Sequence, residues 1–173
     1  MNFLEIYNSD LSRYSRLPKW NKKWHYYFRK CQVTQNKILK LYYRYKFQKI
    51  SVKHGIEIPW RTSILGGLYI GHSYGITINQ DAKLGKNINI HKGVTIGQEN
   101  RGKRKGSPTI GNNVWIGINA TIVGNITIGD DVLIAPNSYV NIYVPSHSVV
   151  IGNPCVIHHK DEATKDYINR EVI

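Results

Sequence analysis

The chain has few cysteines and no long apolar run, and each absence narrows what the protein can be. Cys31 and Cys155 are the only cysteines in 173 residues, and they stand far apart. They therefore predict neither a disulfide framework nor a metal site, and they suit a reducing compartment. No apolar stretch is long enough to cross a bilayer, and residues 1–6 show no basic flank followed by an apolar signal segment. We expect a cytoplasmic protein without a bound metal.

Acidic side chains are also scarce. The chain has 24 Lys and Arg against 11 Asp and Glu, a net charge of +13. Residues 1–56 hold 13 of these cations against two acids, Glu5 and Asp10, which gives this segment a charge of +11. Such asymmetry favours contact with nucleic acid or with an anionic membrane. No nucleic-acid-binding motif accompanies the charge, so we do not expect nucleic acid as a partner.

Glycine and proline are absent from residues 19–49. Large side chains recur there at helical spacing, with basic residues between them. One or two amphipathic helices are predicted, entered at Pro18 and left near Gly55, within an N-terminal helical segment of residues 1–56. The aromatic stripe of residues 19–49 can cap the following domain or contact a neighbouring subunit. A basic aromatic helix can also lie on an anionic membrane surface, and the sequence leaves these alternatives open.

What the chain has in abundance is a six-residue repeat between Ile58 and Val150. Six residues match neither the helix period nor the simple alternation of a hairpin sheet. They match a parallel β-solenoid, in which each hexad is one short strand plus a turn and each aliphatic residue points to a common axis. The repeat forms three runs, namely Ile58, Ile64, Ile70 and Ile76; Ile78, Leu84, Ile90 and Ile96; and Ile110, Ile116, Ile122, Ile128, Ile134 and Val140.

Two breaks in the repeat mark candidate sites. The step from Ile70 to Ile78 is eight residues, so the turn over residues 71–75 must carry extra chain. The step from Ile96 to Ile110 is fourteen residues, so a loop over residues 98–106 must leave the coil. Binding and catalytic groups tend to lie on loops that interrupt a rigid scaffold.

The repeat and its interruptions resemble the hexapeptide-repeat acyltransferases, most closely their serine O-acetyltransferase-like branch. The segments that carry the resemblance are Glu57-Ile58, Gly71-His72-Ser73-Tyr74-Gly75, Gly93-Val94-Thr95-Ile96-Gly97, Ser107-Pro108-Thr109-Ile110-Gly111, Val123-Gly124-Asn125-Ile126 and Val150-Ile151-Gly152-Asn153-Pro154. The resemblance implies a mainly β fold, a left-handed parallel β-helix over residues 57–157, with a C-terminal tail over residues 158–173. The left hand follows from the resemblance alone, because ordinary β-crossovers are right-handed.

The resemblance also implies transfer of an acetyl group from acetyl-CoA to a hydroxyl, in a homotrimer with active sites between subunits. His72 falls on the catalytic histidine of the family. Histidine suits this role because a hydroxyl becomes a good nucleophile only when a base of near-neutral pKa removes its proton. Glu57 matches the acidic partner of the family, usually an aspartate, which would orient the imidazole and stabilise its cation.

Further residues are expected to contact the two substrates. Small residues at turns could let the pantetheine of acetyl-CoA lie against the backbone, and basic residues of the long loop could meet its phosphates. These donor-binding candidates are Gly97, Gly117 and Ala135, with Arg101, Lys103, Arg104 and Lys105. The acceptor-binding candidates are Ser73, Tyr74, His91 and Ser107.

The chain departs from the serine enzymes at two places. They have an acidic residue before the catalytic histidine, where this chain has Gly71, and an Arg-His pair where it has Gly106-Ser107. Those groups are associated with holding the ammonium and carboxylate of serine. Their loss predicts a sugar or glycan-precursor hydroxyl as acceptor, in polysaccharide biosynthesis. A true serine O-acetyltransferase and a non-catalytic solenoid scaffold remain as alternatives.

Overall fold

Three helices precede the strands in the computed structural model, which describes residues 2–16 and 18–172. They are α1 (Phe3–Ser12), α2 (Lys19–Val33) and α3 (Lys37–Lys53). The helices predicted over residues 19–49 are confirmed as α2 and α3, and Pro18 is the N-cap residue of α2. The sequence analysis does not predict α1, although Asn2 and Glu5 form a capping box at its start. Within the described residues, no helix is both long and apolar enough to cross a membrane.

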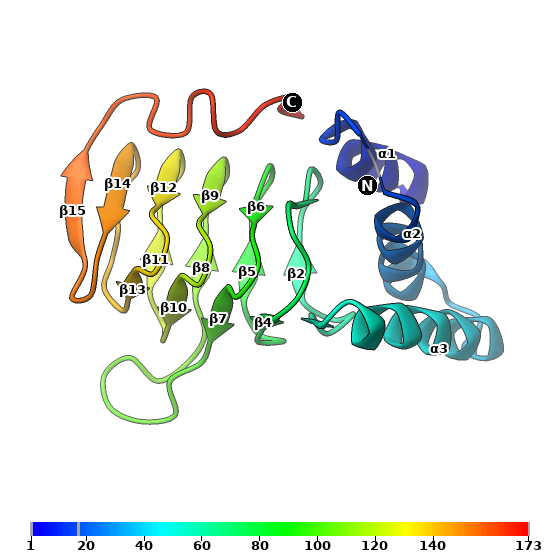
Figure 1. Ribbon diagram of the computed structural model, residues 1–173. Helices are drawn as coiled ribbons and strands as arrows, with labels where there is room; N and C mark the ends of the chain where they lie inside the picture. Colours follow the sequence, from blue (N-terminus) through cyan, green and yellow to red (C-terminus); the bar gives the residue numbers. More distant parts are fainter. Residues whose placement is uncertain (1, 17, 173) are drawn as a thin grey trace.

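The strands stack in three sheets that form the sides of one coil, and all pairs are parallel except β14 with β15 (Figure 1). Sheet A contains β1 (Ile56–Glu57), β4 (Ile76–Ile78), β7 (Thr95–Gly97), β10 (Thr121–Val123) and β13 (Tyr139–Val140). Sheet B contains β2 (Ser63–Ile64), β5 (Lys83–Leu84), β8 (Thr109–Ile110) and β11 (Thr127–Ile128). Sheet C contains β3 (Tyr69–Ile70), β6 (Asn89–Ile90), β9 (Val114–Ile116), β12 (Val132–Ile134), β14 (Ser148–Ile151) and β15 (Val156–His159).

The repeated aliphatic residues form the core of this coil, as the six-residue period predicts. Every member of the run from Ile110 to Val140 is at most 2% exposed. The parallel register places equivalent residues above one another, so that Ile70 pairs with Ile90 and Ile90 with Ile116. Each fully buried side chain of this kind stabilises the fold by about 1.5–3 kcal/mol. The coil is therefore held together by a column of stacked aliphatic side chains on each side.

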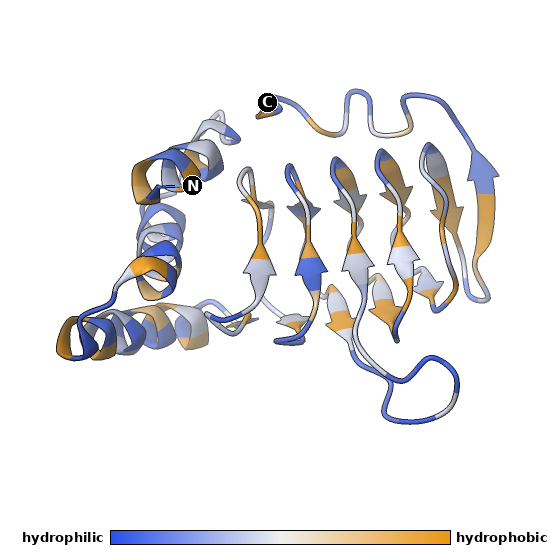
Figure 2. Cartoon of the chain, turned by 180° about the vertical axis from the view of Figure 1, so that it is seen from behind, coloured by the Kyte–Doolittle hydropathy of each residue, from blue (hydrophilic) through white to orange (hydrophobic). Residues whose placement is uncertain are grey.

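The extra residues at both breaks leave the coil, as expected. From Ile70 to Thr77 the chain takes 7 residues, whereas the register-matched step from Ile90 to Thr95 takes 5. The turn over residues 71–75 is thus two residues longer than its neighbour. The step from Ile96 to Thr109 takes 13 residues, against 5 in the coil before it. Its surplus forms a hydrophilic loop beside β7, closed at its base by a bridge between Glu99 and Gly106 (Figure 2).

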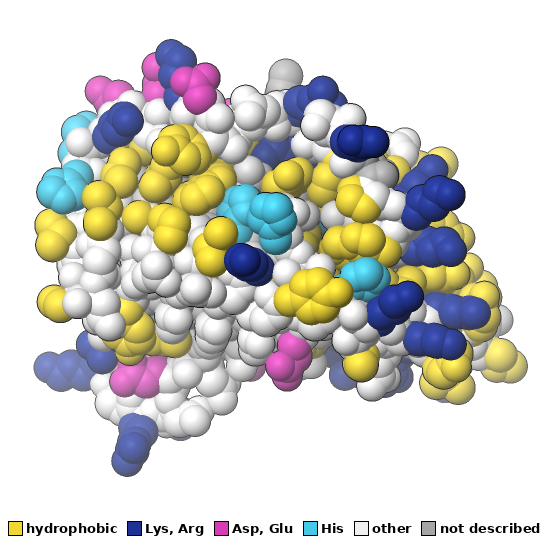
Figure 3. Space-filling model, in the orientation of Figure 1, with side chains coloured by type: hydrophobic (Ala, Val, Ile, Leu, Met, Phe, Trp, Pro, Cys, Tyr) yellow, Lys and Arg dark blue, Asp and Glu magenta, His cyan; other side chains and the backbone are white. Residues whose placement is uncertain are grey.

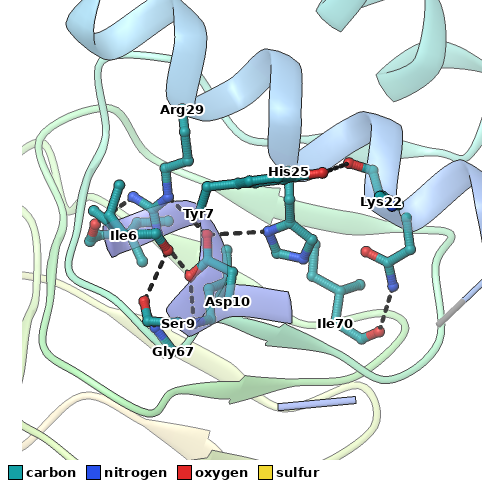
Figure 4. A network of polar contacts seen from close by, with 12 residues as sticks. Ile6, Tyr7, Ser9, Asp10, Lys22, His25, Arg29, Gly67 and Ile70 are labelled. Carbon is teal, nitrogen blue, oxygen red and sulfur yellow. Dashed lines mark hydrogen bonds and ion pairs between the residues drawn. The ribbon is translucent and has the colours of Figure 1, made fainter. Parts of the chain in front are cut away.

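A buried polar network fastens α1 and α2 to the first coil (Figure 4). Asp10 accepts hydrogen bonds from Arg29 at 2.8 and 3.1 Å and from the Leu68 backbone at 2.9 Å. Arg29 also donates to the carbonyls of Ile64 and Leu65. Both charged side chains are fully buried. Burial alone would raise the pKa of Asp10, but the charges and hydrogen bonds of Arg29 and His25 lower it overall.

The aromatic residues of the helical segment divide between the core and the surface. Trp24 and Phe28 of α2 are fully buried and join the solenoid core, together with Phe47 of α3. This packing covers the first coil, as the capping interpretation expects. The apolar side chains on the other face of α3 stay exposed, among them Ile38, Leu41 and Tyr45.

The last residues fold back along the solenoid. β15 pairs antiparallel with β14 and ends at His159, two residues beyond the expected boundary at residue 157. The chain then runs back beside the coils toward α1 (Figure 1). Asp131 accepts hydrogen bonds from the backbone of Ala163 and Thr164, and Asn87 binds the backbone of Val172. This tail therefore lies along sheet C and closes one side of it.

Candidate active site

His72 stands on the lengthened turn between β3 and β4, at the corner where sheet C leads into sheet A. We call this the C–A corner. Its side chain is exposed, whereas the following Ser73 is buried and Tyr74 is 61% exposed with a φ of 81°. The equivalent turn of the next coil is two residues shorter. The extra length of the turn over residues 71–75 lets it hold the imidazole of His72 outside the coil.

His91 lies next to His72, one coil further along the same corner. The two ring centroids are 6.1 Å apart, and the ring of His91 packs 4.8 Å from that of Trp115. Burial, with a smaller contribution from the charge of His72, lowers the pKa of His91 to about 4. His91 is therefore neutral near pH 7, and it can hydrogen-bond beside His72 without carrying charge. In Figure 3, histidine side chains gather at the middle of this face, between hydrophobic ones.

The ring of His91 also explains the glycine before His72. A Cβ atom placed on Gly71 would lie 2.6 Å from Nδ1 of His91 and 2.7 Å from its Cε1. An acidic side chain at position 71 would need the space that this ring fills. The absence of a side chain at position 71 therefore makes room for the ring of His91.

Glu57 is not joined to His72 within this chain. It lies exposed on β1, in sheet A, and accepts a hydrogen bond from Oγ1 of Thr77 at 3.4 Å. No ion pair or hydrogen bond between Glu57 and His72 occurs among the described residues. The expected orienting role of Glu57 therefore stays a prediction.

The residues expected to bind acetyl-CoA lie at two different corners. Gly117 and Ala135 follow β9 and β12, so they belong to the C–A corner above His91. Gly97 ends β7 and pairs with Val123, at the corner where sheet A leads into sheet B. We call this the A–B corner. A Cβ atom on Gly117 would lie 2.6 Å from the nitrogen of Pro136, so close stacking requires glycine there and keeps the corner flat.

The long loop and Ser107 also belong to the A–B corner. The side chain of Arg104 pairs with Glu99 at 3.0 Å, and the carbonyl of Arg104 accepts a hydrogen bond from the backbone of Asn125. Both contacts of Arg104 therefore stabilise the loop. Ser107 donates to Asn79 at 3.0 Å. The other cations of the loop, Arg101, Lys103 and Lys105, are exposed.

A pocket that the sequence analysis does not predict lies beside His91. Its volume is about 410 Å³. The N-terminal segment, the outer face of sheet C and the C-terminal tail line it with Arg13, Ser15, Tyr69, Asn89, His91, Trp115, Tyr167, Asn169 and Arg170. Part of this set was readable from the repeat, because Tyr69, Asn89 and Trp115 occupy one register position. Nothing in the spacing indicates that Arg13 and Arg170 meet there.

Among the described residues, no three His, Cys, Asp or Glu side chains gather closely enough to hold a metal ion. The two cysteines are free thiols, and burial raises the pKa of Cys31 to about 11. Cys31 is therefore a poor nucleophile at neutral pH.

Comparison with known proteins shows which proteins this chain is similar to. The model of the bacterial transferase hexapeptide (six repeats) matches residues 107–141. Serine acetyltransferase from Staphylococcus xylosus is 41% identical over 107 residues, which cover 62% of this chain and 50% of that protein. Over its solenoid the chain is thus similar to hexapeptide-repeat transferases. Serine acetyltransferase from Helicobacter pylori is 37% identical over the same length, covering 62% of this chain and 63% of that protein. This hexapeptide-repeat chain thus spans about half to two thirds of these relatives.

Solved structures extend this similarity to most of the chain. The Neisseria gonorrhoeae serine acetyltransferase in complex with serine has a TM-score of 0.70 and 28% identity, covering 89% of this chain and 68% of that one. Soybean serine acetyltransferase complexed with serine has a TM-score of 0.76, 24% identity and coverages of 90% and 69%, and supports the fold alone. The expected left-handed parallel β-helix is confirmed by these neighbours.

The predicted sugar or glycan acceptor, and with it a role in polysaccharide biosynthesis, is wrong. The relatives that match the solenoid of this hexapeptide-repeat chain are serine acetyltransferases at 37–41% identity. The inference failed because it treated the positions of Gly71, Gly106 and Ser107 as the only means of holding an amino acid. Arg13 and Arg170, brought to His91 by the tertiary fold, are outside every repeat that it considered.

Proposed function

We propose that this protein is an acetyl-CoA-dependent O-acetyltransferase that acetylates the hydroxyl of serine, with His72 as general base. The observation that carries the proposal is the lengthened turn that holds an exposed imidazole outside the coil, at the position of the family's catalytic histidine. The similarity of the solenoid to serine acetyltransferases supports serine as the acceptor.

In the proposed reaction His72 removes the proton of the serine hydroxyl while the hydroxyl oxygen attacks the thioester carbonyl carbon. The new C–O bond forms as the C–S bond breaks, and the imidazolium returns its proton to the departing CoA thiolate. The products are O-acetylserine and CoA. The acyl group passes directly between the substrates, so the mechanism needs no covalent enzyme intermediate.

We propose a homotrimer, because one chain carries the two halves of the site at different corners. His72, Gly117 and Ala135 lie at the C–A corner, whereas Gly97 and the basic loop lie at the A–B corner. A second copy that brings its A–B corner to the C–A corner of the first would complete a groove for acetyl-CoA. Arg101, Lys103 and Lys105 would then meet the phosphates of the donor bound to the neighbouring subunit.

The test of the proposed function is release of free thiol from acetyl-CoA on addition of L-serine. We expect release by the wild-type protein and not by His72→Ala, with an unchanged circular dichroism spectrum and unchanged mass in solution. Wild-type protein that releases no thiol from acetyl-CoA when L-serine is added would refute the proposed function and favour the scaffold alternative. A His72→Ala variant with near-normal rates would refute the assignment of the general base.

We further propose that α3 makes a peripheral contact with an anionic membrane, from a cytoplasmic location that suits the two free thiols. Ile38, Leu41 and Tyr45 lie on one helical face and are 83%, 65% and 61% exposed. Lysine and arginine side chains flank them, as in Figure 3 at the helical end of the molecule.

Co-sedimentation with vesicles containing phosphatidylserine tests this contact. We expect binding at low salt that the double variant Ile38→Gln, Leu41→Gln abolishes. Ile142→Gln, which changes an exposed apolar residue of the solenoid, is the matched control and should keep binding. Wild-type protein that stays in the supernatant at low salt would remove the membrane contact.

A further inference from the structure

The pocket beside His91 is strongly basic. Its wall contains the guanidinium groups of Arg13 and Arg170, and no carboxylate occurs among the described residues that line it. The acidic residue whose charge reaches Arg13 is Glu171, and its carboxylate accepts a hydrogen bond from Asn113 at 3.0 Å. The charge of the pocket is therefore not neutralised from within its own wall, which favours an anionic ligand.

Arg13 is a cation held in place at the base of this pocket. It is 4% exposed, donates to Oδ1 of Asn89 at 2.6 Å and also donates to the carbonyl of Asn169. Its Nε hydrogen has no acceptor among the described residues. A guanidinium stays protonated in proteins, so this buried charge is stabilised by any anion that enters the pocket.

Arg170 supplies donors that a ligand can reach. One of its terminal nitrogens donates to the carbonyl of Tyr14 at 3.0 Å, which fixes the direction of the guanidinium. The side chain is otherwise exposed at the pocket rim. Because the planar guanidinium offers two parallel N–H groups, its remaining edge matches a carboxylate.

The pocket lies beside the proposed catalytic group and is separated from it by one side chain, His91. His91 lines it, and the ring centroid of His91 lies 6.1 Å from that of His72. We propose that this pocket is the acceptor site, and that Arg170, supported by the charge of Arg13, binds the carboxylate of the acceptor. This inference rests on the proposed function. Arg170 would then supply a group that binds the amino acid, in a chain that has Gly71, Gly106 and Ser107 where the serine enzymes have charged or ionisable residues.

The experiment combines one substitution with one change of substrate. L-Serinamide keeps the hydroxyl and the amine of L-serine but lacks the carboxylate. We expect Arg170→Gln to lower kcat/KM for L-serine by about 10- to 100-fold, mostly through KM, since a hydrogen bond to a charged group is lost. The value for L-serinamide should change by less than about threefold, because no carboxylate is present to be bound. Arg170→Lys keeps the charge but not the planar pair of N–H donors, so its kcat/KM for L-serine should lie between those of the wild type and Arg170→Gln.

Lys165→Gln is the matched control, since Lys165 lies in the same tail, is exposed and pairs with Glu162 rather than with the pocket. It should leave both substrates unaffected. Equal losses for L-serine and L-serinamide in Arg170→Gln would overturn the inference, and so would an equal loss in Lys165→Gln.

A binding measurement separates this inference from the proposed function. Trp115 lines the pocket, so bound L-serine should change its fluorescence, and Trp115→Phe should remove that change. Wild-type protein that turns over neither substrate refutes the proposed function. If it still binds L-serine, and Arg170→Gln weakens that binding, the carboxylate site is supported; if binding is absent or independent of Arg170, the site is refuted.

Discussion

The fully buried Asp10–Arg29 ion pair joins α1 and α2 to the first coil, and Arg29→Met tests its contribution. Methionine fills a similar volume but removes the positive charge. Asp10 would then lie fully buried, with His25, whose Nδ1 is 3.4 Å away, as its remaining ionisable neighbour. The carbonyls of Ile64 and Leu65 would also lose their donor.

The expected cost follows from this geometry. Removing one partner of a buried pair leaves an uncompensated charge and costs about 3–5 kcal/mol. That is a large part of the roughly 5–15 kcal/mol by which a domain is stable. The double variant Asp10→Asn, Arg29→Met removes both charges, and its amide oxygen can still accept from Leu68. We expect the double variant to be more stable than Arg29→Met alone.

Urea unfolding at pH 7, followed by circular dichroism at one fixed protein concentration, measures these differences. Lys49→Met, an exposed substitution on α3, is the control and should cost less than about 0.5 kcal/mol. The wild-type pair should also weaken in acid. Because the folded pKa of Asp10 is lowered, its contribution is complete above its unfolded pKa of about 3.9 and is lost as the pH falls through the lower folded value. A cost below about 1 kcal/mol for Arg29→Met, or no recovery in the double variant, would refute this reasoning.

Three further outcomes are expected. His72→Gln should lower kcat about 10²- to 10⁴-fold with little change in the melting temperature, measured by thiol release and calorimetry; retained activity would contradict the role of a general base. Because the folded pKa of His91 is about 4, the unfolded chain binds more protons between that value and about 6.5, so stability should fall as the pH drops across this window. His91→Phe should flatten that part of the pH profile of urea midpoints, and an unchanged slope would exclude His91 as its source. Gly71→Ala should cost about 1–3 kcal/mol because its Cβ would meet the ring of His91, and His91→Ala should relieve most of that cost in the double variant.

The proposed trimer and donor site could be inferred only in part from the sequence. Gly97 lies at the A–B corner, whereas Gly117 and Ala135 lie at the C–A corner. A hexad repeat gives the position of each residue in its own stack, but it does not show which residues of a neighbouring subunit would face it. Glu57 likewise stands fifteen residues before His72 in the sequence, yet within one chain it contacts Thr77 instead.

The six-residue period predicts the solenoid and its two interruptions without any tertiary information. A six-residue period of aliphatic side chains predicts a coil of short strands and turns, although not its hand. A surplus of residues in one step must leave that coil, so the turn of His72 and the basic loop follow from counting. These features are local, since each hexad needs only its neighbours in the stack.

The pocket beside His91, in contrast, depends on long-range packing. Arg13 precedes the repeat, and Arg170 follows it 157 residues later. Arg13 donates a hydrogen bond to the carbonyl of Asn169, and Arg170 donates one to the carbonyl of Tyr14, so the tail lies against the N-terminal segment. No periodicity connects such residues, because their meeting depends on how the two ends of the chain pack on sheet C. The repeat therefore specified the scaffold, whereas the packing of the non-repeating ends placed the charges beside it.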